Sequence, residues 1–423
     1  MSRIAVIGTG YVGLTTGAYL AHLGHEVVCA DVVPEKVEML NRGHIPIFEA
    51  GLEDLVREGL DGGRLRFVLG SASAVGDAEF VFLCVPTPQG EDGSADMSYI
   101  EDAARQIGPH LQSEAIVINK STVPVGSTRV VEAALGRDDV AVVSNPEFLR
   151  EGSAVHDCLH PDRIVIGCED QAAALRVASL FEKLNAPLMV TDPASAETIK
   201  YASNAFLATK VSFINAVANL CEAVGADVRE VVLGMGYDKR IGFEFLKPGP
   251  GWGGSCFPKD TRALVRIGED AGYDFGLLRG VVTVNEEQYE RVAEKIVRMA
   301  GGSVAGKTVA VWGLAFKART DDVRESPSLE VVARLVDRGA KVKAYDPAVQ
   351  RPLDGIEVLD DPYSPCEGAS VLAVLTEWDE FRWLDLAKVF GLMEEPRIVD
   401  ARNLLEPAAV RRRGFLYDCL GRG

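Results

Sequence analysis

The sequence is poor in basic side chains: its 423 residues include 44 Lys and Arg against 62 Asp and Glu, a formal net charge of −18. A chain this acidic repels phosphate backbones and anionic lipid surfaces, so nucleic acid and membranes are not expected partners. It also lacks any apolar run near the ~18–20 residues needed to cross a bilayer. An anionic ligand therefore has to be held by cations placed within a local pocket.

Clustered cysteine is also lacking. The eight cysteines form no Cys-x-x-Cys pair; they are Cys29, Cys84, Cys158, Cys168, Cys221, Cys256, Cys366 and Cys419. In a chain of this length, scattered thiols indicate a reducing compartment and exclude a disulfide framework or a zinc site. His156 and His160 are four residues apart, but Pro161 follows at once, which argues against a metal site. From the spacing of Cys and His, we expect no metal. The N-terminus has no signal-peptide layout, so we expect a cytoplasmic protein.

Glycine, by contrast, is abundant, with 42 residues, about 10% of the chain against ~7% in typical proteins. Part of the excess forms Gly8-x-Gly10-x-x-Gly13, between an apolar strand-like run and a helical stretch. In such a loop the first glycine permits a tight turn, the second admits a pyrophosphate and the third lets the helix pack on the strand. Asp31 ends the next predicted strand, where a carboxylate can bind a ribose hydroxyl and repel a 2′-phosphate. The combination predicts a dinucleotide site that prefers NAD to NADP.

Apolar strand-like runs alternate with helix-length segments through residues 1–192, which predicts a mostly parallel, doubly wound sheet. From Ser195 to about Val224 the sequence contains neither Gly nor Pro, and one helix of that length would span ~45 Å. We expect this helix to join the domains and to pair two subunits into a homodimer.

A second, smaller α/β domain is predicted beyond Gly301 and Gly302. Its strands are expected at 308–312, 341–345 and 371–375, with Ile398 and Val399 in a short last strand. Ser326 followed by Pro327 predicts a helix start with serine as the cap. The predicted fold class is therefore α/β, with two Rossmann-like doubly wound domains joined by a long central helix. The expected boundaries are 1–192 for an NAD-binding domain, 193–302 for a central helical region and 303–423 for the C-terminal domain.

Polar loops follow three predicted strands of the first domain. They are Val85-Pro86-Thr87-Pro88, Lys120-Ser121-Thr122-Val123-Pro124-Val125-Gly126 and Asn145-Pro146-Glu147-Phe148-Leu149-Arg150-Glu151-Gly152. Ligands of open α/β sheets bind beyond the carboxyl ends of the strands. Any one of these loops is explained as a simple connection, but three in succession favour the rim of an active site.

A fourth loop, from Phe245 to Asp260, holds four Gly and three Pro within sixteen residues. Pro258 suits the first position of a helix, which would place Cys256 at or just before the helix N-terminus. There the helix dipole and Lys259 favour the thiolate form. A lone thiol is usually a buried packing residue, but its setting between Gly-Gly-Ser and Pro-Lys-Asp favours a nucleophile.

Lys200 and Asn204 lie four residues apart on the long predicted helix and therefore share a face. On spacing alone a solvated polar stripe is the commoner explanation, because Asn215 and Asn219 repeat the same spacing.

Taken in order, these motifs resemble those of the UDP-glucose/GDP-mannose dehydrogenase family, and the resemblance covers essentially the whole chain. Its most specific piece is Gly253-Gly-Ser-Cys256-Phe-Pro-Lys259-Asp260, supported by Asn145-Pro-Glu147-Phe-Leu-Arg-Glu151 and Gly313-Leu-Ala-Phe-Lys317. The resemblance implies an N-terminal NAD domain, a central dimerisation region and a C-terminal nucleotide-sugar domain.

The resemblance also implies a reaction, in which the C6 alcohol of a nucleotide sugar is oxidised to a carboxylate by two hydride transfers without release of the aldehyde. A thiol is needed because its addition turns the aldehyde into a thiohemiacetal, which loses a second hydride to give a thioester that water cleaves. Motif matches imply the catalytic roles: Cys256 as nucleophile, Lys200 and Asn204 at the oxyanion, Glu147 as base for hydrolysis, and Thr122 and Asp260 positioning water and Lys200.

Further motif matches imply binding contacts. Those implied for NAD are Gly8, Gly10, Val12, Gly13, Asp31, Lys36, Thr87, Thr122, Glu151, Lys259 and Arg324. Those implied for the nucleotide sugar are Phe148, Leu149, Arg150, Glu151, Lys200, Asn204, Phe245, Leu246, Lys247, Pro248, Gly249, Gly253 and Lys317. Arg240 resembles an arginine that reaches the substrate of the partner subunit. Lys317 and Arg240 would supply the positive charge that a pyrophosphate needs.

UDP-glucose is the expected substrate, because the residues around Cys256 resemble those of UDP-glucose enzymes more than those of GDP-mannose enzymes. Relatives that act on UDP-N-acetylmannosamine usually have His where this chain has Ser255. Trp252 replaces a more frequent Tyr or Phe, which leaves the contact made there open. The alternatives are the same chemistry on GDP-mannose or UDP-N-acetylmannosamine, a two-electron NAD-dependent hydroxyacid dehydrogenase, and a non-catalytic sensor of NAD and nucleotide sugar.

Overall fold

The computed structural model describes residues 1–90 and 95–422. The chain folds into two compact units, the first made of Met1–Ser203 and Arg262–Ala271, the second of Asn204–Thr261 and the residues from Gly272 onward. No helix among the described residues combines the length and the apolar character that a membrane crossing requires. The predicted three-part division at residues 192 and 302 stays a prediction, because these units are defined by compactness alone.

The described residues of the first unit form an eight-stranded sheet in the order β3-β2-β1-β4-β5-β6-β7-β8. The strands are β1 (Arg3–Ile7), β2 (Glu26–Asp31), β3 (Leu65–Leu69), β4 (Phe80–Leu83), β5 (Ile116–Asn119), β6 (Ala141–Ser144), β7 (Ile164–Gly167) and β8 (Leu188–Thr191). Neighbouring strands run parallel except β6 and β7, which pair antiparallel. The predicted mostly parallel sheet is therefore confirmed.

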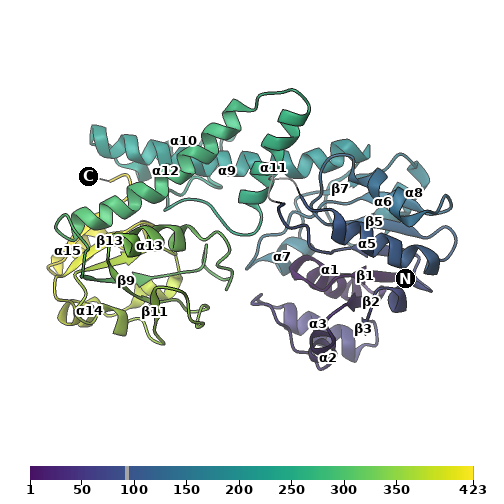
Figure 1. Cartoon of the computed structure of the whole chain (residues 1–423), viewed down its shortest axis with the longest axis horizontal. Coiled ribbons are helices and arrows are strands. Elements are labelled where there is room, and N and C mark those ends of the chain that lie inside the picture. The colour runs from purple at the N-terminus through teal and green to yellow at the C-terminus, as the bar shows by residue number, and fades with distance from the viewer. Residues whose placement is uncertain (91–94, 423) are drawn as a thin grey trace. The chain divides into compact units, whose positions relative to one another are not determined.

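Helices cover both faces of this sheet (Figure 1). One face packs against α1 (Tyr11–His22), α3 (Leu52–Asp61), α7 (Ala154–Leu159) and α8 (Gln171–Ser179). The other face packs against α4 (Ala72–Val75), α5 (Ser98–Ile107) and α6 (Ser127–Leu135), while α2 (Pro34–Asn41) follows β2. Strands covered on both faces are apolar at successive positions, which explains the continuous apolar runs of the sequence. The loops that follow β1, β4 and β5 leave from carboxyl ends at the same edge of the sheet.

The described part of the second unit contains a six-stranded, all-parallel sheet in the order β11-β10-β9-β12-β13-β14. Its strands are β9 (Thr308–Trp312), β10 (Lys341–Tyr345), β11 (Ile356–Val358), β12 (Val371–Val374), β13 (Arg397–Asp400) and β14 (Leu416–Cys419). α12 (Gly276–Met299) and α13 (Pro327–Asp337) pack on one face, and α14 (Leu386–Leu392) and α15 (Pro407–Arg412) on the other. The predicted second α/β sheet beyond Gly302 is confirmed, while the bounds 303–423 of a separate domain stay a prediction.

Two strands of this sheet were missing from the sequence prediction, and the prediction that residues 398–399 form the last strand is wrong. β14 follows that strand and pairs with it in parallel. β14 reads Leu-Tyr-Asp-Cys, and β11 is only three residues long, so neither shows an apolar run. Edge position explains both omissions, because an edge strand needs fewer buried side chains. The helix start at Ser326 is confirmed, with its side chain accepting a hydrogen bond from the backbone N–H of Ser328.

The long helix is also confirmed as α9 (Pro193–Val224). It is followed by α10 (Val228–Gly236), and α11 (Phe257–Asp270) follows the glycine-rich loop. Within the second unit, Ile214, Ala218 and Cys221 of α9 pack with Val228 and Leu246. The apolar side chains of Phe206, Phe213 and Leu220 are exposed instead, and their spacing of seven places them along one stripe of the helix.

Candidate active site

The loop between β1 and α1 contains three glycines. The backbone packing requires glycine at two of these positions but not at the third. Gly8 has φ +93, and a Cβ there would lie 2.6 Å from the carbonyl oxygen of Cys84. A Cβ at Gly13 would lie 1.9 Å from the carbonyl oxygen of Gly8. A Cβ at Gly10, in contrast, would meet no described atom within 4 Å, and no side chain in the described chain caps α1 there. This open approach to a helix N-terminus fits a bound pyrophosphate.

Asp31 lies at the end of β2 and faces this loop. Its Oδ2 accepts hydrogen bonds from the Thr9 backbone N–H (3.1 Å), the Thr9 hydroxyl and Lys36 Nζ (3.0 Å). Burial acts to raise the pKa of Asp31, but Thr9 and Lys36 outweigh it and hold the pKa at about 2. Asp31 is therefore ionised at neutral pH, as an acceptor for ribose hydroxyls must be.

The second sheet repeats this arrangement, but the helix that follows its turn is capped by a side chain. Gly313 follows β9 with φ +95, and a Cβ there would lie 2.3 Å from Thr376 Cβ. Asp346, which is fully buried, accepts the backbone N–H groups of Leu314 (2.7 Å) and Ala315 (3.0 Å). α13 is capped by its own Ser326. The N-terminus of α1, which no described side chain caps, is thus the one that suits a dinucleotide.

Lys200 of α9 and Glu147, in the loop after β6, form a buried ion pair. Lys200 Nζ lies 2.7 Å from Glu147 Oε1, and their side chains are 4% and 5% exposed. The second carboxylate oxygen accepts the backbone N–H of Leu149 at 2.7 Å. Burial acts to raise the pKa of Glu147, but Lys200, Leu149 and Lys120 together hold it below its ordinary value. Glu147 is therefore a carboxylate at neutral pH.

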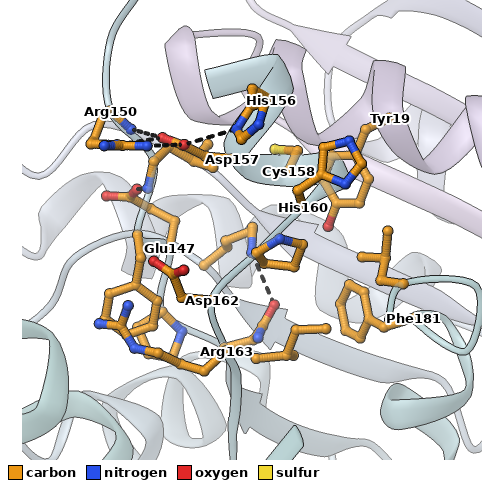
Figure 2. Close-up of a pocket in the computed structure, with 18 residues that line it drawn as sticks. Tyr19, Glu147, Arg150, His156, Asp157, Cys158, His160, Asp162, Arg163 and Phe181 are labelled. Carbon is orange, nitrogen blue, oxygen red and sulfur yellow. Dashed lines mark hydrogen bonds and ion pairs between the residues drawn. The ribbon is translucent and has the colours of Figure 1, made fainter. Parts of the chain in front are cut away.

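Two cations beside this pair carried no role in the sequence analysis, and both line a pocket of about 130 Å³ that also reaches Glu147 (Figure 2). Lys120 Nζ donates to Asn145 Oδ1 at 3.0 Å, and burial lowers the pKa of this lysine. The Arg163 guanidinium lies 3.7 Å from the ring centroid of Phe148. The sequence feature that could have identified these two cations is their position next to a strand. Lys120 directly follows a buried strand, and Arg163 directly precedes one.

α9 also fixes the loop that carries Thr122. Glu197, one turn before Lys200, accepts the backbone N–H groups of Gly126 (2.6 Å) and Thr128 (3.1 Å) and the Thr128 hydroxyl (2.9 Å). Thr87 Oγ1 donates to the carbonyl oxygen of Thr122 at 2.9 Å, which brings two predicted cofactor contacts together. Adjacent turns of one helix thus hold the loops after β5 and β6.

Three predicted catalytic residues lie in the second unit. Asn204 is in α9, Asp260 is in α11, and Cys256 directly precedes α11. Asn204 Nδ2 donates to Asp260 Oδ2 at 2.6 Å, and Lys259 Nζ lies 2.6 Å from Asp260 Oδ1. The carbonyl of Cys256 accepts the backbone N–H of Asp260 (2.9 Å), which places the thiol at the helix N-terminus as predicted. Phe257 rather than Pro258 is the first helical residue. Ser255 Oγ lies 3.5 Å from Cys256 Sγ.

The glycine-rich segment before Cys256 is held by backbone contacts. The Gly249 N–H donates to Asn215 Oδ1 and its carbonyl accepts from Gln288 Nε2, both at 2.9 Å. A Cβ at Gly253 would lie 1.9 Å from the carbonyl oxygen of Glu325, so only glycine fits. Trp252 is buried and its indole N–H donates to Ser212 Oγ at 2.8 Å. The indole of Trp252 is therefore bound to α9, of which Ser212 is a part.

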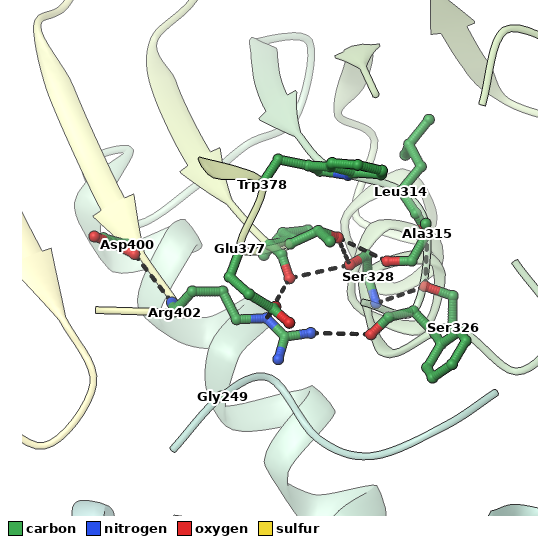
Figure 3. Close-up of polar contacts among 12 residues, drawn as sticks. Gly249, Leu314, Ala315, Ser326, Ser328, Glu377, Trp378, Asp400 and Arg402 are labelled. Carbon is green, nitrogen blue, oxygen red and sulfur yellow. Dashed lines mark hydrogen bonds and ion pairs between the residues drawn. The ribbon is translucent and has the colours of Figure 1, made fainter. Parts of the chain in front are cut away.

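Arg402 is a further cation that sequence reasoning missed (Figure 3). Its guanidinium donates to the carbonyl oxygens of Leu375 (2.8 Å) and Phe316 (3.2 Å). A Cβ at Gly249 would lie 3.0 Å from Arg402 Nη1, so this glycine makes room for the arginine. The signal was again position, two residues beyond the end of β13.

The remaining predicted residues make local contacts of their own. Three arginines are held by a nearby aspartate in bidentate pairs, namely Arg150 by Asp157, Arg240 by Asp238 and Arg324 by Asp322. Lys317 Nζ lies 5.2 Å from the ring centroid of Phe316, and the Phe245 and Phe257 rings are 6.0 Å apart. Leu246 is buried, Pro248 is half-buried and Lys247 is exposed; Val12, Glu151 and Leu149 are half-buried in the first unit. Lys259 and Arg324 belong to the second unit, whereas the other predicted NAD contacts belong to the first.

Comparison with known proteins assigns most of the chain to one family. Three models of the UDP-glucose/GDP-mannose dehydrogenase family match, describing an NAD binding domain at residues 2–185, a central domain at 194–287 and a UDP binding domain at 310–407. UDP-glucose 6-dehydrogenase TuaD of Bacillus subtilis is 45% identical, covering 100% of this chain and 94% of that protein. UDP-glucose 6-dehydrogenase of Pseudomonas aeruginosa is also 45% identical, covering 99% and 97%.

Among solved structures, a UDP-glucose dehydrogenase from the archaeon Pyrobaculum islandicum superposes with a TM-score of 0.92 at 39% identity, covering 100% of this chain and 98% of that one. The predicted fold class is confirmed by this neighbour and by the two sheets. With matched models over most of its length and relatives at this level of identity, the chain belongs to the UDP-glucose/GDP-mannose dehydrogenase family.

Proposed function

We propose that this protein is an NAD-dependent UDP-glucose 6-dehydrogenase, which oxidises the C6 alcohol of UDP-glucose to the carboxylate of UDP-glucuronate. The observation that carries the proposal is the pairing on adjacent turns of α9. In the first unit Lys200 is bonded to Glu147; in the second, Asn204 is bonded to Asp260, whose helix α11 begins directly after Cys256. An ammonium, an amide, an ionised carboxylate and a thiol are the groups that thioester chemistry requires.

NAD fits the residues of the first unit. The open space at Gly10, the uncapped end of α1 and the ionised Asp31 would hold its pyrophosphate and ribose. The loops of Thr87, Thr122 and Glu151 supply the other contacts that we assign to the cofactor, with Val12, Lys36, Lys259 and Arg324. NAD would supply the hydride acceptor, one NAD for each of the two oxidations.

Cys256 is the nucleophile of the proposed mechanism. Once the C6 alcohol has lost a hydride and a proton, the Cys256 thiolate adds to the aldehyde carbon and forms a thiohemiacetal. Loss of a second hydride leaves a thioester on Cys256. The position of the thiol at the N-terminus of α11 favours the thiolate that this addition needs. The covalent bond explains why the aldehyde is not released between the two oxidations.

Lys200 and Glu147 act on the oxygen atoms of the reaction. The Lys200 ammonium, with Asn204, stabilises the negative charge that develops on the C6 oxygen. Glu147 is ionised, so it can take a proton from the water that attacks the thioester. Thr122 and Asp260 are assigned to positioning, since Thr122 is tied to Thr87 and Asp260 to Asn204. Cleavage returns the thiol and releases the carboxylate.

The nucleotide part of the substrate is assigned to the second unit. The segment from Phe245 to Gly253 offers fixed backbone groups. Lys317 and Arg402, the latter paired with Glu377 at 3.1 Å, place cationic groups near it. An acidic protein can bind a diphosphate in this way because local, partly buried cations outweigh a distant net charge. Phe148, Leu149 and Arg150 are assigned to the sugar side.

The stoichiometry of the reaction tests the proposal directly. With UDP-glucose and NAD, two NADH are expected for each UDP-glucose consumed, because alcohol and thiohemiacetal each lose one hydride. NADH absorbance combined with chromatographic measurement of both nucleotide sugars gives the ratio. A ratio of one would indicate simple alcohol oxidation and contradict the thioester mechanism. No turnover of UDP-glucose, with turnover of GDP-mannose or UDP-N-acetylmannosamine, would contradict the substrate.

We also propose a homodimer paired through α9. Phe206, Phe213 and Leu220 form an exposed apolar stripe with a spacing of seven, which is the spacing at which two helices pack side by side. Arg240, with an 89% exposed side chain held by Asp238, is assigned to the substrate of the partner subunit. A cytoplasmic location and the absence of a metal stay predictions from the sequence.

Replacing Phe213 with glutamate is expected to convert the dimer to a monomer, because it places a charge within the apolar stripe. Sedimentation velocity at micromolar concentration measures the change. Trp383→Glu is the matched control, since Trp383 is an exposed aromatic residue of the C-terminal sheet domain. A wild-type protein that sediments as a monomer would contradict the proposed pairing.

A further inference from the structure

Glu49 connects two loops of the first unit that are distant in sequence. It lies between α2 and α3, and its Oε2 accepts hydrogen bonds from the Tyr11 hydroxyl and from the backbone N–H of Gly152 at 2.7 Å. The same N–H lies 3.0 Å from the Tyr11 hydroxyl oxygen. One carboxylate oxygen, one phenol and one backbone N–H therefore form a closed three-membered cluster, which we call the Glu49 bridge.

The bridge is buried, and this makes it costly to disturb. Glu49 is only 7% exposed, and its Oε1 is buried with no hydrogen-bond partner among the described residues. Burial, and then Glu49, raise the pKa of Tyr11 well above its ordinary value, so the phenol keeps its proton and remains a donor. Burying a carboxylate oxygen without a hydrogen-bond partner costs stability. We therefore look for the role of Glu49 in the hydrogen bonds that its other oxygen accepts.

The two residues that the bridge joins stand next to the proposed ligand contacts. Tyr11 is the first residue of α1, between Gly10 and Val12. Gly152 follows Glu151 and has φ +79, a conformation that favours glycine. Fixing the Gly152 N–H to the Tyr11 side chain therefore fixes the segment from Glu147 to Gly152 against the N-terminus of α1.

We infer that Glu49 and Tyr11 are positioning residues that set the substrate-side loop, Glu147 to Gly152, at the distance from the dinucleotide helix that lets both ligands bind together. The inference rests on the proposed function in one respect, that the end of α1 and Glu151 hold NAD. Neither residue touches the reacting atoms in this proposal. Both act through Gly152, and their loss changes ligand affinity through the loop.

Tyr11→Phe and Glu49→Gln test the bridge with little change in side-chain volume. Tyr11→Phe removes the donor and leaves the carboxylate bound to Gly152 alone, whereas Glu49→Gln removes the charge but keeps one acceptor oxygen. The dissociation constant of NADH, measured by its fluorescence in the protein without substrate, is expected to rise about tenfold for each. Tyr11→Phe/Glu49→Gln is expected to differ little from either single variant, because the three groups act as one unit.

Hydrogen exchange supplies a readout that does not depend on activity. The Gly152 amide is expected to exchange faster in Tyr11→Phe, and faster still in Glu49→Ala, than in the wild-type protein. Tyr99→Phe is the matched control, because it removes the hydroxyl of an exposed tyrosine on α5 of the same unit, away from the contacts of the bridge. For this control we expect wild-type exchange at Gly152 and a dissociation constant within about twofold of the wild type, a change of ~0.4 kcal/mol or less.

The outcomes separate this inference from the proposed function. Suppose that the wild-type protein binds NADH and oxidises UDP-glucose. If Tyr11→Phe and Glu49→Gln then only lower the melting temperature and leave NADH affinity and Gly152 exchange unchanged, the positioning role is wrong. If the wild-type protein binds no NADH, the proposed function is wrong, whereas faster Gly152 exchange in the variants would still support the bridge as a link between the loops.

Discussion

Cys256→Ser is expected to lower the steady-state rate of UDP-glucuronate formation by at least about 10³-fold, because serine is far less ionised than cysteine and forms no thioester. The thiol is suited to this role by its surroundings. Among the eight cysteines only Cys256 and Cys168 are partly exposed, and the others are buried. Burial raises the pKa of Cys84 to about 12, which is typical of an inert packing thiol. NADH production at saturating UDP-glucose measures the loss.

Cys168→Ser is the matched control for this substitution. Cys168 is the other partly exposed thiol, but burial raises its pKa and it lies just beyond β7 rather than at a helix N-terminus. We expect its activity to stay within about twofold of the wild type. Unchanged turnover in Cys256→Ser would refute the covalent mechanism, while equal losses in both variants would indicate general damage to the fold.

Lys200→Ala is expected to have the second largest effect, on stability as well as on activity. Removing the ammonium leaves the Glu147 carboxylate buried with the Leu149 N–H as its closest described donor. Breaking a buried ion pair in this way costs about 3–5 kcal/mol of unfolding free energy. Losing a donor to the developing oxyanion costs about 10²–10³-fold in kcat. Denaturant unfolding and single-turnover rates measure the two effects separately.

Lys200→Met/Glu147→Leu separates the structural from the catalytic contribution. Replacing both partners with apolar residues of similar size removes the unpaired charge, so most of the lost stability is expected to return. Activity is expected to stay absent, because neither the ammonium nor the base is restored. Recovery of activity in this double variant would contradict the roles assigned to both residues.

The pH dependence of stability follows from the direction of the Glu147 shift. The folded pKa of Glu147 lies below its ordinary value of 4.5, so the folded state binds its proton less readily than the unfolded state. The stability contributed by the pair is complete above pH 4.5 and is lost as the pH falls through the folded pKa. Unfolding free energies measured across this range should fall more steeply for the wild type than for Lys200→Met/Glu147→Leu.

Much of the fold was predictable because its signals are local. Gly8, Gly13 and Asp31 are set by a turn and a strand end within the first thirty-one residues, and Ser326 caps α13 through a bond to Ser328. The long helix could be predicted from the absence of Gly and Pro alone. In each case the cause lies within a few residues of the effect, so the sequence shows it directly.

The parts of the candidate site that escaped prediction depend on contacts between distant segments. Glu49 and Gly152 are 103 residues apart, and Glu197 and Gly126 are 71 apart. Nothing near Glu49 in the sequence distinguishes it from a solvent-exposed glutamate. Arg402 lies in space that is free because residue 249 is a glycine, and this contact is visible only in the folded second unit. The catalytic roles of Cys256, Lys200 and Glu147 stay predictions until the substitutions above are made.

The serine cap of α13 has a consequence for ligand discrimination. The protein carries the same strand–turn design twice, and its two proposed ligands both contain a diphosphate. In both copies an aspartate accepts a backbone N–H of the turn, Asp31 from Thr9 and Asp346 from Leu314. The copies differ at the helix that follows, because Ser326 caps α13 while no side chain in the described chain caps α1. A helix N-terminus open to a diphosphate is therefore a property of the first copy, and we expect the second unit to hold its diphosphate through cationic side chains instead.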